Sequence, residues 1–173
     1  VTEIADTPPI REASALQLQL WLGDGYEAAR AAAEREGDPA AIDLLEHFST
    51  RAEAMAPDAI AKALTRRATL VRDWSLFLAE HSVLLVPVSA ELPFPDGLDR
   101  TGEAGIARAF EANVLQVGLA PIGVPALTVT TGLVGRTPVG VQLVASRYRE
   151  DLCLAAGAVI EAGGVPEMPI DPV

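Results

Sequence analysis

Serine, histidine, lysine and cysteine are the residues of this 173-residue sequence that could act as a nucleophile or a base. A serine hydrolase needs a nucleophile, a base and an oxyanion hole within reach of one another. None of the six serines lies in a Gly-x-Ser-x-Gly turn, which presents the nucleophile in many hydrolases. Ser82 follows His81, but adjacent side chains on an extended segment point in opposite directions, so we expect no catalytic pair there. We expect His81 to help end a helix and His47 to be a surface or packing residue.

The single lysine and the single cysteine give no sign of catalysis either. Lys62 lies in an amphipathic helical pattern, which is typical of a surface lysine. Cys153 lies between two leucines without a nearby histidine or lysine to lower its pKa, so we expect an inert buried thiol. One cysteine excludes an internal disulfide and a multi-cysteine zinc site, and two histidines are too few for a histidine-rich metal site. We therefore predict no metal and no cofactor.

Composition limits the partners of the chain. Lys and Arg number 13 and Asp and Glu number 24, so the formal net charge is −11. An acidic chain without basic clusters repels phosphate backbones, so we expect no nucleic acid partner. No apolar run reaches the roughly 20 residues of a membrane-spanning helix. The first residues lack a basic, signal-like region, and we expect a cytoplasmic protein or a piece of one. No glycine-rich loop has phosphate-binding spacing, which weakens the alternative of a nucleotide-binding domain.

The first part of the chain, residues 1–82, is predicted to be mainly helical. Residues 1–4 resemble the end of a strand, ahead of two consecutive prolines that break regular structure. We expect Gly23-Asp24-Gly25 to divide the first helical stretch into two helices. The helical patterns cover residues 11–36, a segment that starts at Asp38-Pro39, and residues 57–80.

The remaining part, residues 83–173, is predicted to be rich in strands. Its first strand is a short apolar run, which is typical of a strand buried on both faces. Gly132 to Pro138 is a tight connection and predicts a hairpin between the other two strands. The expected strands are residues 83–88, 126–130 and 139–144, and the expected helices are residues 105–115 and 149–162.

These elements predict an α/β fold in which a mixed β-sheet is covered by helices, built as one segment without a linker. The strands have the composition of central strands, whereas the helices can cover only part of the sheet. Something else must cover the rest, either chain outside this sequence or a second copy. We therefore expect self-association or a docked second part.

Three motifs stand out near the C-terminus: Gly123-Val124-Pro125-Ala126, Pro138-Val139-Gly140-Val141-Gln142 and Glu150-Asp151. They resemble the end of the amidase signature family, which has a Gly-Leu-Pro-Ala strand, a glycine-containing loop, a Pro-x-Gly-x-Gln strand and a helix that starts near a Glu-Asp pair. Upstream, residues 82–87 are similar to the family's strand that ends in proline. The resemblance covers essentially all 173 residues and identifies the chain as the C-terminal part of the amidase signature fold.

The resemblance implies hydrolysis of a carbon–nitrogen bond in a small-molecule amide. Family members use a serine nucleophile, a bridging serine on a cis peptide, a lysine base and a Gly/Ser-rich oxyanion segment, all in the N-terminal half. This chain has no Gly-Gly-Ser-Ser segment, and Lys62 lies in a context that does not match. We therefore expect no catalytic residue here and no activity from the chain alone. Its expected role is to supply sheet core and one wall of the substrate cleft.

Two residues are candidates for that wall. In glutamine-using members an acidic residue contacts the substrate, and its ungapped match here is Asn113. The family often has an asparagine where this chain has Ala120. Loss of the carboxylate argues against a glutaminyl-tRNA amidotransferase role. Asn113 and Gln116 are the candidate substrate-binding residues, with helix-to-strand packing as the alternative for both. A different interpretation of the whole chain is a non-catalytic interaction module derived from an amidase.

Overall fold

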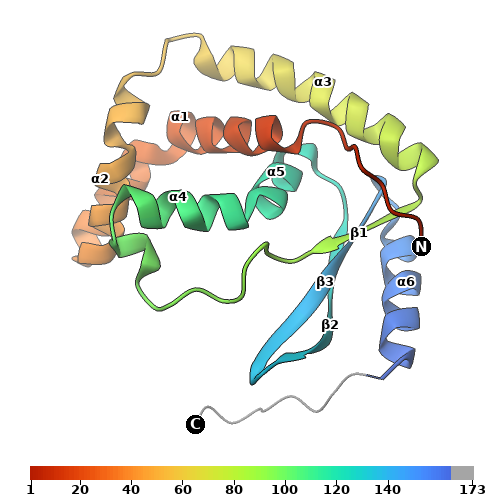
Figure 1. Ribbon diagram of the computed structural model, residues 1–173. Coiled ribbons are helices and arrows are strands. Elements are labelled where there is room, and N and C mark those ends of the chain that lie inside the picture. The colour runs from red at the N-terminus through yellow and green to blue at the C-terminus, as the bar shows by residue number, and fades with distance from the viewer. Residues whose placement is uncertain (165–173) are drawn as a thin grey trace.

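The computed structural model describes residues 1–164, apart from the side chains of Thr50, Arg51 and Glu53. Helices α1, α2 and α4 lie together on one side, α6 flanks the sheet on the other, and α3 runs along the top of the view in Figure 1. The elements are α1 (Ile10–Glu36), α2 (Pro39–Glu53), α3 (Ala59–Glu80), β1 (Val83–Pro87), a 3₁₀ turn (Leu98–Arg100), α4 (Glu103–Ala112), α5 (Val114–Ile122), β2 (Ala126–Val134), β3 (Thr137–Ala145) and α6 (Glu150–Ala162).

The N-terminal segment corrects two of the sequence predictions. Residues 1–4 form no strand; Ile4 instead packs against the main hydrophobic core. Helix α1 also runs unbroken through Gly23-Asp24-Gly25. Each glycine lowers the stability of a helix by only about 1 kcal/mol relative to alanine. The helix-forming residues on both sides outweigh that loss. The space that a Gly23 Cβ would occupy is filled by the Ile60 side chain of α3.

The three strands form one antiparallel sheet in the order β1-β3-β2. The predicted hairpin is confirmed, since β2 and β3 pair directly across a two-residue turn at Gly135-Arg136. Gly135 has a φ of 63°, which an L side chain rarely adopts and which suits a tight hairpin turn. A bulge between Thr130 and Gly132 shifts the register once.

Side chains on the two faces of the sheet enter two different cores. On one face Val129 and Leu143 pack with Cys153 of α6. On the other face Leu84 and Val144 join a larger cluster built on the helices. The buried members of the larger cluster are Ala13, Leu16, Ala63, Leu70, Trp74, Leu78, Leu84, Leu119, Ile122 and Val144. Alternation along β3 therefore places successive side chains in the two different cores.

Strand β1 is not buried on both faces, contrary to the sequence prediction. It lies at one edge of the sheet that the described residues form, and Leu85 is 48% exposed. Helix α6 packs mainly on β2 and β3, so it does not reach over β1 to cover Leu85. An apolar strand with a free edge is a ready template for pairing.

Residues 105–115 form not one helix but parts of two, α4 and α5, which meet at Asn113. The backbone of Asn113 leaves the helical region there, so the axis changes direction. Helix α5 then packs closely on α1 at Gly118, where an added Cβ would lie 2.7 Å from the Ile10 carbonyl oxygen. The contact requires glycine and fixes the end of α1 against α5.

Two arginines hold the C-terminal end of α5 through its carbonyl groups. Arg67 of α3 donates from Nε to the Pro121 oxygen at 2.6 Å. Arg147, which follows β3, donates from Nη2 to Ile122 at 2.8 Å and from Nε to Gly123 at 3.1 Å. A cation at a helix C-terminus satisfies free carbonyls and complements the helix dipole.

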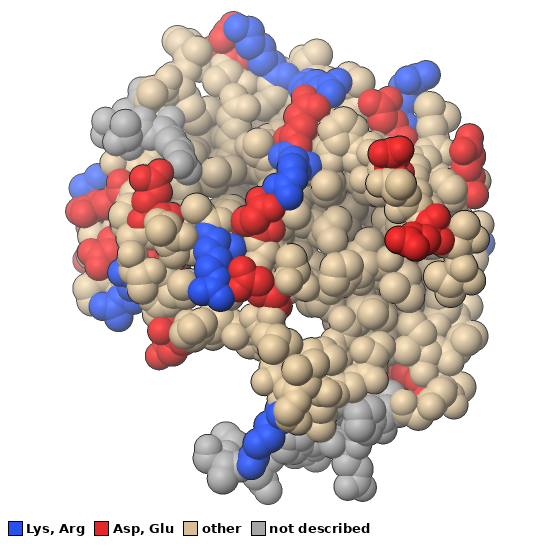
Figure 2. All heavy atoms as spheres, in the orientation of Figure 1, with Lys and Arg blue, Asp and Glu red and all other residues tan. Residues whose placement is uncertain are grey.

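Charged side chains of both signs are interleaved over the helical part of the face in Figure 2, whereas the part over the strands is mostly uncharged. Several of these charges pair across elements, such as Glu12 of α1 with Arg66 of α3 and Glu91 with Arg108 of α4. Both of these pairs are partly exposed and tie separate parts of the chain together at the surface. Among residues 1–164, no helix is long and apolar enough to cross a membrane.

Candidate functional site

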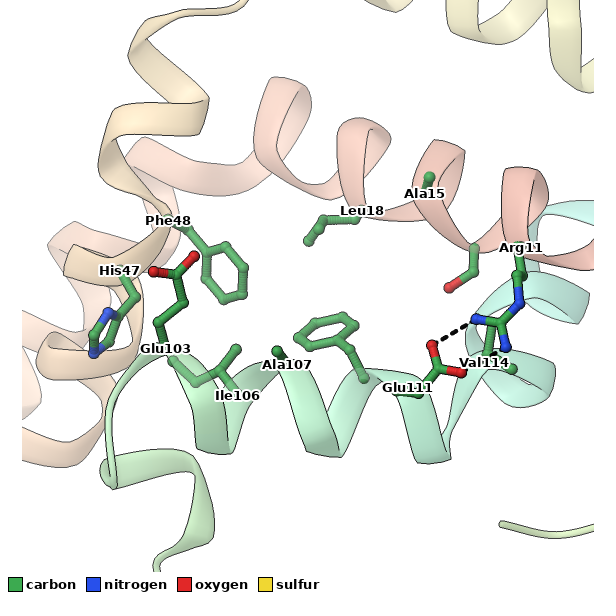
Figure 3. Close-up of a pocket in the computed structure, with 12 residues that line it drawn as sticks. Arg11, Ala15, Leu18, His47, Phe48, Glu103, Ile106, Ala107, Glu111 and Val114 are labelled. Atoms are coloured by element: carbon green, nitrogen blue, oxygen red, sulfur yellow. Dashed lines mark hydrogen bonds and ion pairs between the residues drawn. The ribbon is translucent and has the colours of Figure 1, made fainter. Parts of the chain in front are cut away.

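The cavity between α1, the end of α2 and α4 has a volume of about 510 Å³. We call it the α1–α4 pocket (Figure 3). Its volume falls within the roughly 300–1,000 Å³ range of small-molecule sites. The residues that line it are Arg11, Ser14, Ala15, Leu18, His47, Phe48, Glu103, Ile106, Ala107, Phe110, Glu111 and Val114.

The middle of the α1–α4 pocket is apolar. Phe48 and Phe110 meet edge to face, with ring centroids 5.8 Å apart and planes at 77°. Leu18 enters from α1 and Ile106 from α4, as Figure 3 shows. Positions 103, 106, 107, 110 and 111 follow the i, i+3, i+4, i+7, i+8 pattern that places side chains on one helix face. The amphipathic pattern of α4 therefore builds one wall of the pocket.

The ends of the α1–α4 pocket are polar. At one end Arg11 donates two hydrogen bonds of 2.5 Å to the two oxygens of Glu111, a bidentate pair that ties α1 to α4. These hydrogen bonds and the opposite charge lower the pKa of Glu111 and raise that of Arg11. At the other end lie His47 of α2 and Glu103 of α4 (Figure 3).

A second cavity, of about 580 Å³, lies between the loop after β1 and the β2–β3 hairpin. We call it the hairpin pocket. Thr128 and Thr130 share one face of β2, opposite the face that packs on α6, and line this cavity with hydroxyl groups. In the loop, Ser89 Oγ accepts a hydrogen bond from the backbone N–H of Glu91 at 3.2 Å, which shapes the turn.

The sequence candidate Asn113 lies between α4 and α5. It lines the hairpin pocket, and its neighbour Val114 lines the α1–α4 pocket. Its Nδ2 donates to the Ala109 carbonyl oxygen at 2.8 Å, which fixes the side chain against the last turn of α4. The other candidate, Gln116, lines neither cavity and donates from Nε2 to the Pro87 oxygen at 3.4 Å. The structure therefore brings Asn113, and not Gln116, to a cavity wall.

Lys62, Cys153 and His81 lie outside the two cavities. Lys62 has a 76% exposed side chain and pairs with Asp58 at 2.8 Å. Cys153 is buried, and its burial raises the pKa of the thiol. The ring of His81 packs at a tilt against Phe77, with centroids 4.6 Å apart, and the His81 backbone N–H caps α3. The expectations of a surface lysine, a buried thiol and a helix-ending histidine are confirmed.

Four serines donate their hydroxyl groups to backbone carbonyl oxygens and so have structural roles. These are Ser49, Ser75, Ser89 and Ser146. Within a helix, such a bond to the preceding turn is typical of an unreactive serine. Ser82, beside His81, is exposed at the entry to β1.

The α1–α4 pocket was not predicted from the sequence. Its pairing of Arg11 with Glu111 joins positions 100 residues apart, and no local pattern encodes such a contact. The one available signal was the apolar face of residues 103–114, which carries Ile106 and Phe110 at helical spacing.

Comparison with known proteins identifies the family. The family model described as Amidase matches residues 27–154. Indoleacetamide hydrolase of Bradyrhizobium japonicum is 35% identical over 116 residues, which are 66% of this chain and 25% of that protein. A glutamyl-tRNA(Gln) amidotransferase subunit from Streptococcus pyogenes serotype M1 is 29% identical over 101 residues, 58% of this chain and 20% of that protein. The chain thus spans about a quarter or less of these relatives.

Solved structures share the fold over nearly the whole chain. One of them is a chain from "an unexpected vestigial protein complex" that "reveals the evolutionary origins of an s-triazine catabolic enzyme". It superposes with a TM-score of 0.75 at 19% identity, and the match covers 97% of this chain and 37% of that one. Substrate-bound 6-aminohexanoate cyclic dimer hydrolase gives a TM-score of 0.68 at 21% identity, covering 96% and 39%. Together with the family match over residues 27–154, which is most of the chain, these similarities show that the chain belongs to the amidase family.

Proposed function

We propose that this chain is the C-terminal portion of an enzyme that hydrolyses a carbon–nitrogen amide bond, and that it forms one wall of the substrate cleft. The observation that carries the proposal is the family match over residues 27–154. The serine–serine–lysine residues that the family resemblance implies are contributed from outside these 173 residues. Support for that division comes from Lys62, the only lysine of the chain, which is exposed and paired with Asp58.

In this proposal the chain binds and orients the amide, and the other part of the protein carries out the bond cleavage. The α1–α4 pocket holds the group attached to the amide carbonyl, because its interior is apolar. Asn113 offers a neutral carboxamide in the wall of the hairpin pocket, where it can exchange hydrogen bonds with a polar substrate group. Holding the amide in one orientation is a large part of catalysis, since orientation lowers the entropic cost of reaching the transition state.

The neutral Asn113 favours an uncharged substrate at this position. A substrate ammonium would meet no carboxylate at residue 113, whereas glutamine-using family members are expected to have one. The proposal therefore places this chain nearer to hydrolases of simple amides, such as the indoleacetamide hydrolase that it resembles, than to an amidotransferase.

Amide turnover by two preparations tests the proposal. The purified 173-residue chain should release no ammonia from aliphatic or aryl amides, whereas the native product of the gene, isolated from its source cells, should do so. In that native product, Asn113→Asp should raise kcat/KM for a cationic amide about tenfold relative to kcat/KM for a neutral amide. This change is equivalent to about 1.4 kcal/mol. Ser75→Ala, on the exposed side of α3, is the control and should leave the ratio unchanged. Turnover by the chain alone that survives purification to constant activity contradicts the proposal.

A second candidate function is a non-catalytic interaction module. The observation that favours it is the free edge of β1 in the sheet of the described residues, where Leu85 is about half exposed. Such an edge would pair with another strand, from a partner or from a second copy. Sedimentation of the purified chain at micromolar concentration distinguishes the outcomes: a dimer or larger species agrees with self-association, and a monomer rules it out. Leu85→Lys should dissociate any oligomer that forms through this edge.

A further inference from the structure

The α1–α4 pocket has the chemistry to select one class of amide, and this inference rests on the proposed function. We infer that the pocket accepts an uncharged aryl or branched alkyl group on the acyl side of the substrate and rejects a group that carries a carboxylate. The inference follows from three features: two aromatic rings, small residues that leave the middle open, and a polar rim whose one described cation is already paired.

The aromatic rings supply the apolar contact. Phe48 is buried, and its edge-to-face contact with Phe110 holds both rings in place. A substrate ring that enters beside them can take a stacked or edge-to-face position, both of which are favourable. Leu18 and Ile106 complete the apolar surface. The rings are therefore fixed before the substrate arrives, and little ordering is required on binding.

Small side chains keep the middle of the pocket open. Ala15 of α1 and Ala107 of α4 line the cavity between the two helices, and Figure 3 shows both short side chains at its walls. A longer side chain at either position would extend into the space that the inferred substrate group occupies. Ala107 is exposed in the free chain, so a larger residue there does not require the core to rearrange.

The charges of the rim disfavour an anion. Among the described residues, Arg11 is the only arginine or lysine that lines the pocket, and Glu111 occupies its guanidinium with two hydrogen bonds. Glu111 offsets the charge of Arg11, so this pair presents no net positive charge to a ligand. A substrate carboxylate would have to displace Glu111 and would then face that carboxylate at short range. Like charges placed together in this way are mutually destabilising.

Ligand titration of the 173-residue chain, followed by NMR, tests the inference. The probes are phenylacetamide, phenylacetate and acetamide. Phenylacetamide should bind with a Kd at least tenfold lower than that of either other probe, and the shifted signals should come from α1, α2 and α4. Ala107→Phe should weaken phenylacetamide binding at least tenfold by filling the cavity. Ala31→Phe is the matched control, since Ala31 is an exposed helical alanine of α1 outside the pocket, and it should change the Kd less than twofold.

Each other outcome overturns the inference. Phenylacetate binding as tightly as phenylacetamide refutes the charge argument, and acetamide binding as tightly refutes the apolar argument. Full affinity in Ala107→Phe places the ligand elsewhere, and absence of phenylacetamide binding refutes the pocket as a ligand site. Circular dichroism of both variants confirms that they fold. The proposed function fails separately, when the native gene product hydrolyses no amide although phenylacetamide still binds.

Discussion

The contact between α1 and α5 at Gly118 gives the sharpest prediction about stability. In an open helix, Gly→Ala stabilises by about 1 kcal/mol because alanine has the higher helix propensity. At Gly118 the added Cβ would lie 2.7 Å from the Ile10 carbonyl oxygen and 2.7 Å from its Cδ1, closer than real Cβ contacts. Overpacking of this kind costs about 1–3 kcal/mol. A strain of about 2 kcal/mol would therefore make Gly118→Ala destabilising by about 1 kcal/mol.

Gly25→Ala in α1 is the matched comparison, because beyond its chain neighbours and the adjacent helix backbone no atom of the described residues lies within 4 Å of its added Cβ. This variant should gain about 1 kcal/mol from propensity alone. The two variants should thus differ by about 2 kcal/mol in the free energy of unfolding, or by about 4–8 °C in Tm for a chain of this size. Urea and thermal unfolding followed by circular dichroism measure the difference. If Gly118→Ala stabilises the chain as much as Gly25→Ala, the packing of α5 on α1 is not as described.

Three further predictions concern the core, the thiol and the rim of the α1–α4 pocket. Leu70→Ala should lower the free energy of unfolding by about 2–5 kcal/mol, whereas exposed Leu76→Ala should stay within about 0.5 kcal/mol; equal losses would contradict the burial of Leu70. Cys153 should react slowly with a thiol reagent at pH 8 and fully in denaturant, since burial raises its pKa; rapid labelling of the folded chain would be the contrary result. Arg11 lowers the pKa of Glu111, so the pair stabilises the fold above the ordinary pKa of a glutamate and loses this effect as the pH falls through the lowered value. The unfolding midpoints of the unmodified chain and of Glu111→Gln should therefore differ at pH 7 and converge in acid. A difference that does not depend on pH would contradict a stabilising ion pair between Arg11 and Glu111.

Local patterns were sufficient for the elements whose geometry depends on neighbouring residues. The helical stripe of residues 57–80 became α3, and the tight connection before Pro138 became the β2–β3 turn. The continuity of α1 was different, because the penalty at Gly23 is offset by packing of Ile60 from a distant helix. Helix propensity depends on residue type alone and cannot predict a contact with a distant helix.

The candidate site was predictable only in part, for the same reason. Asn113 was found through a motif resemblance, and it does line a cavity. The α1–α4 pocket depends on side chains from three helices, and its rim joins Arg11 to Glu111 across 100 residues. Burial of β1 on both faces was expected from its apolar composition, but Leu85 is 48% exposed in the described structure. An apolar run is typical of a buried strand, but it does not specify which segment would cover each face.

The central claim is that this chain lines the cleft of an amidase whose nucleophile lies outside these 173 residues. The most direct test treats the native product of the gene with a fluorophosphonate, which modifies activated serines, and maps the adduct by mass spectrometry of its peptides. The account predicts a product heavier than this chain, one adduct on a serine outside the present sequence, and loss of amide hydrolysis in proportion to labelling. An adduct on a serine of this chain, or amide hydrolysis by a product no heavier than it, would contradict the account.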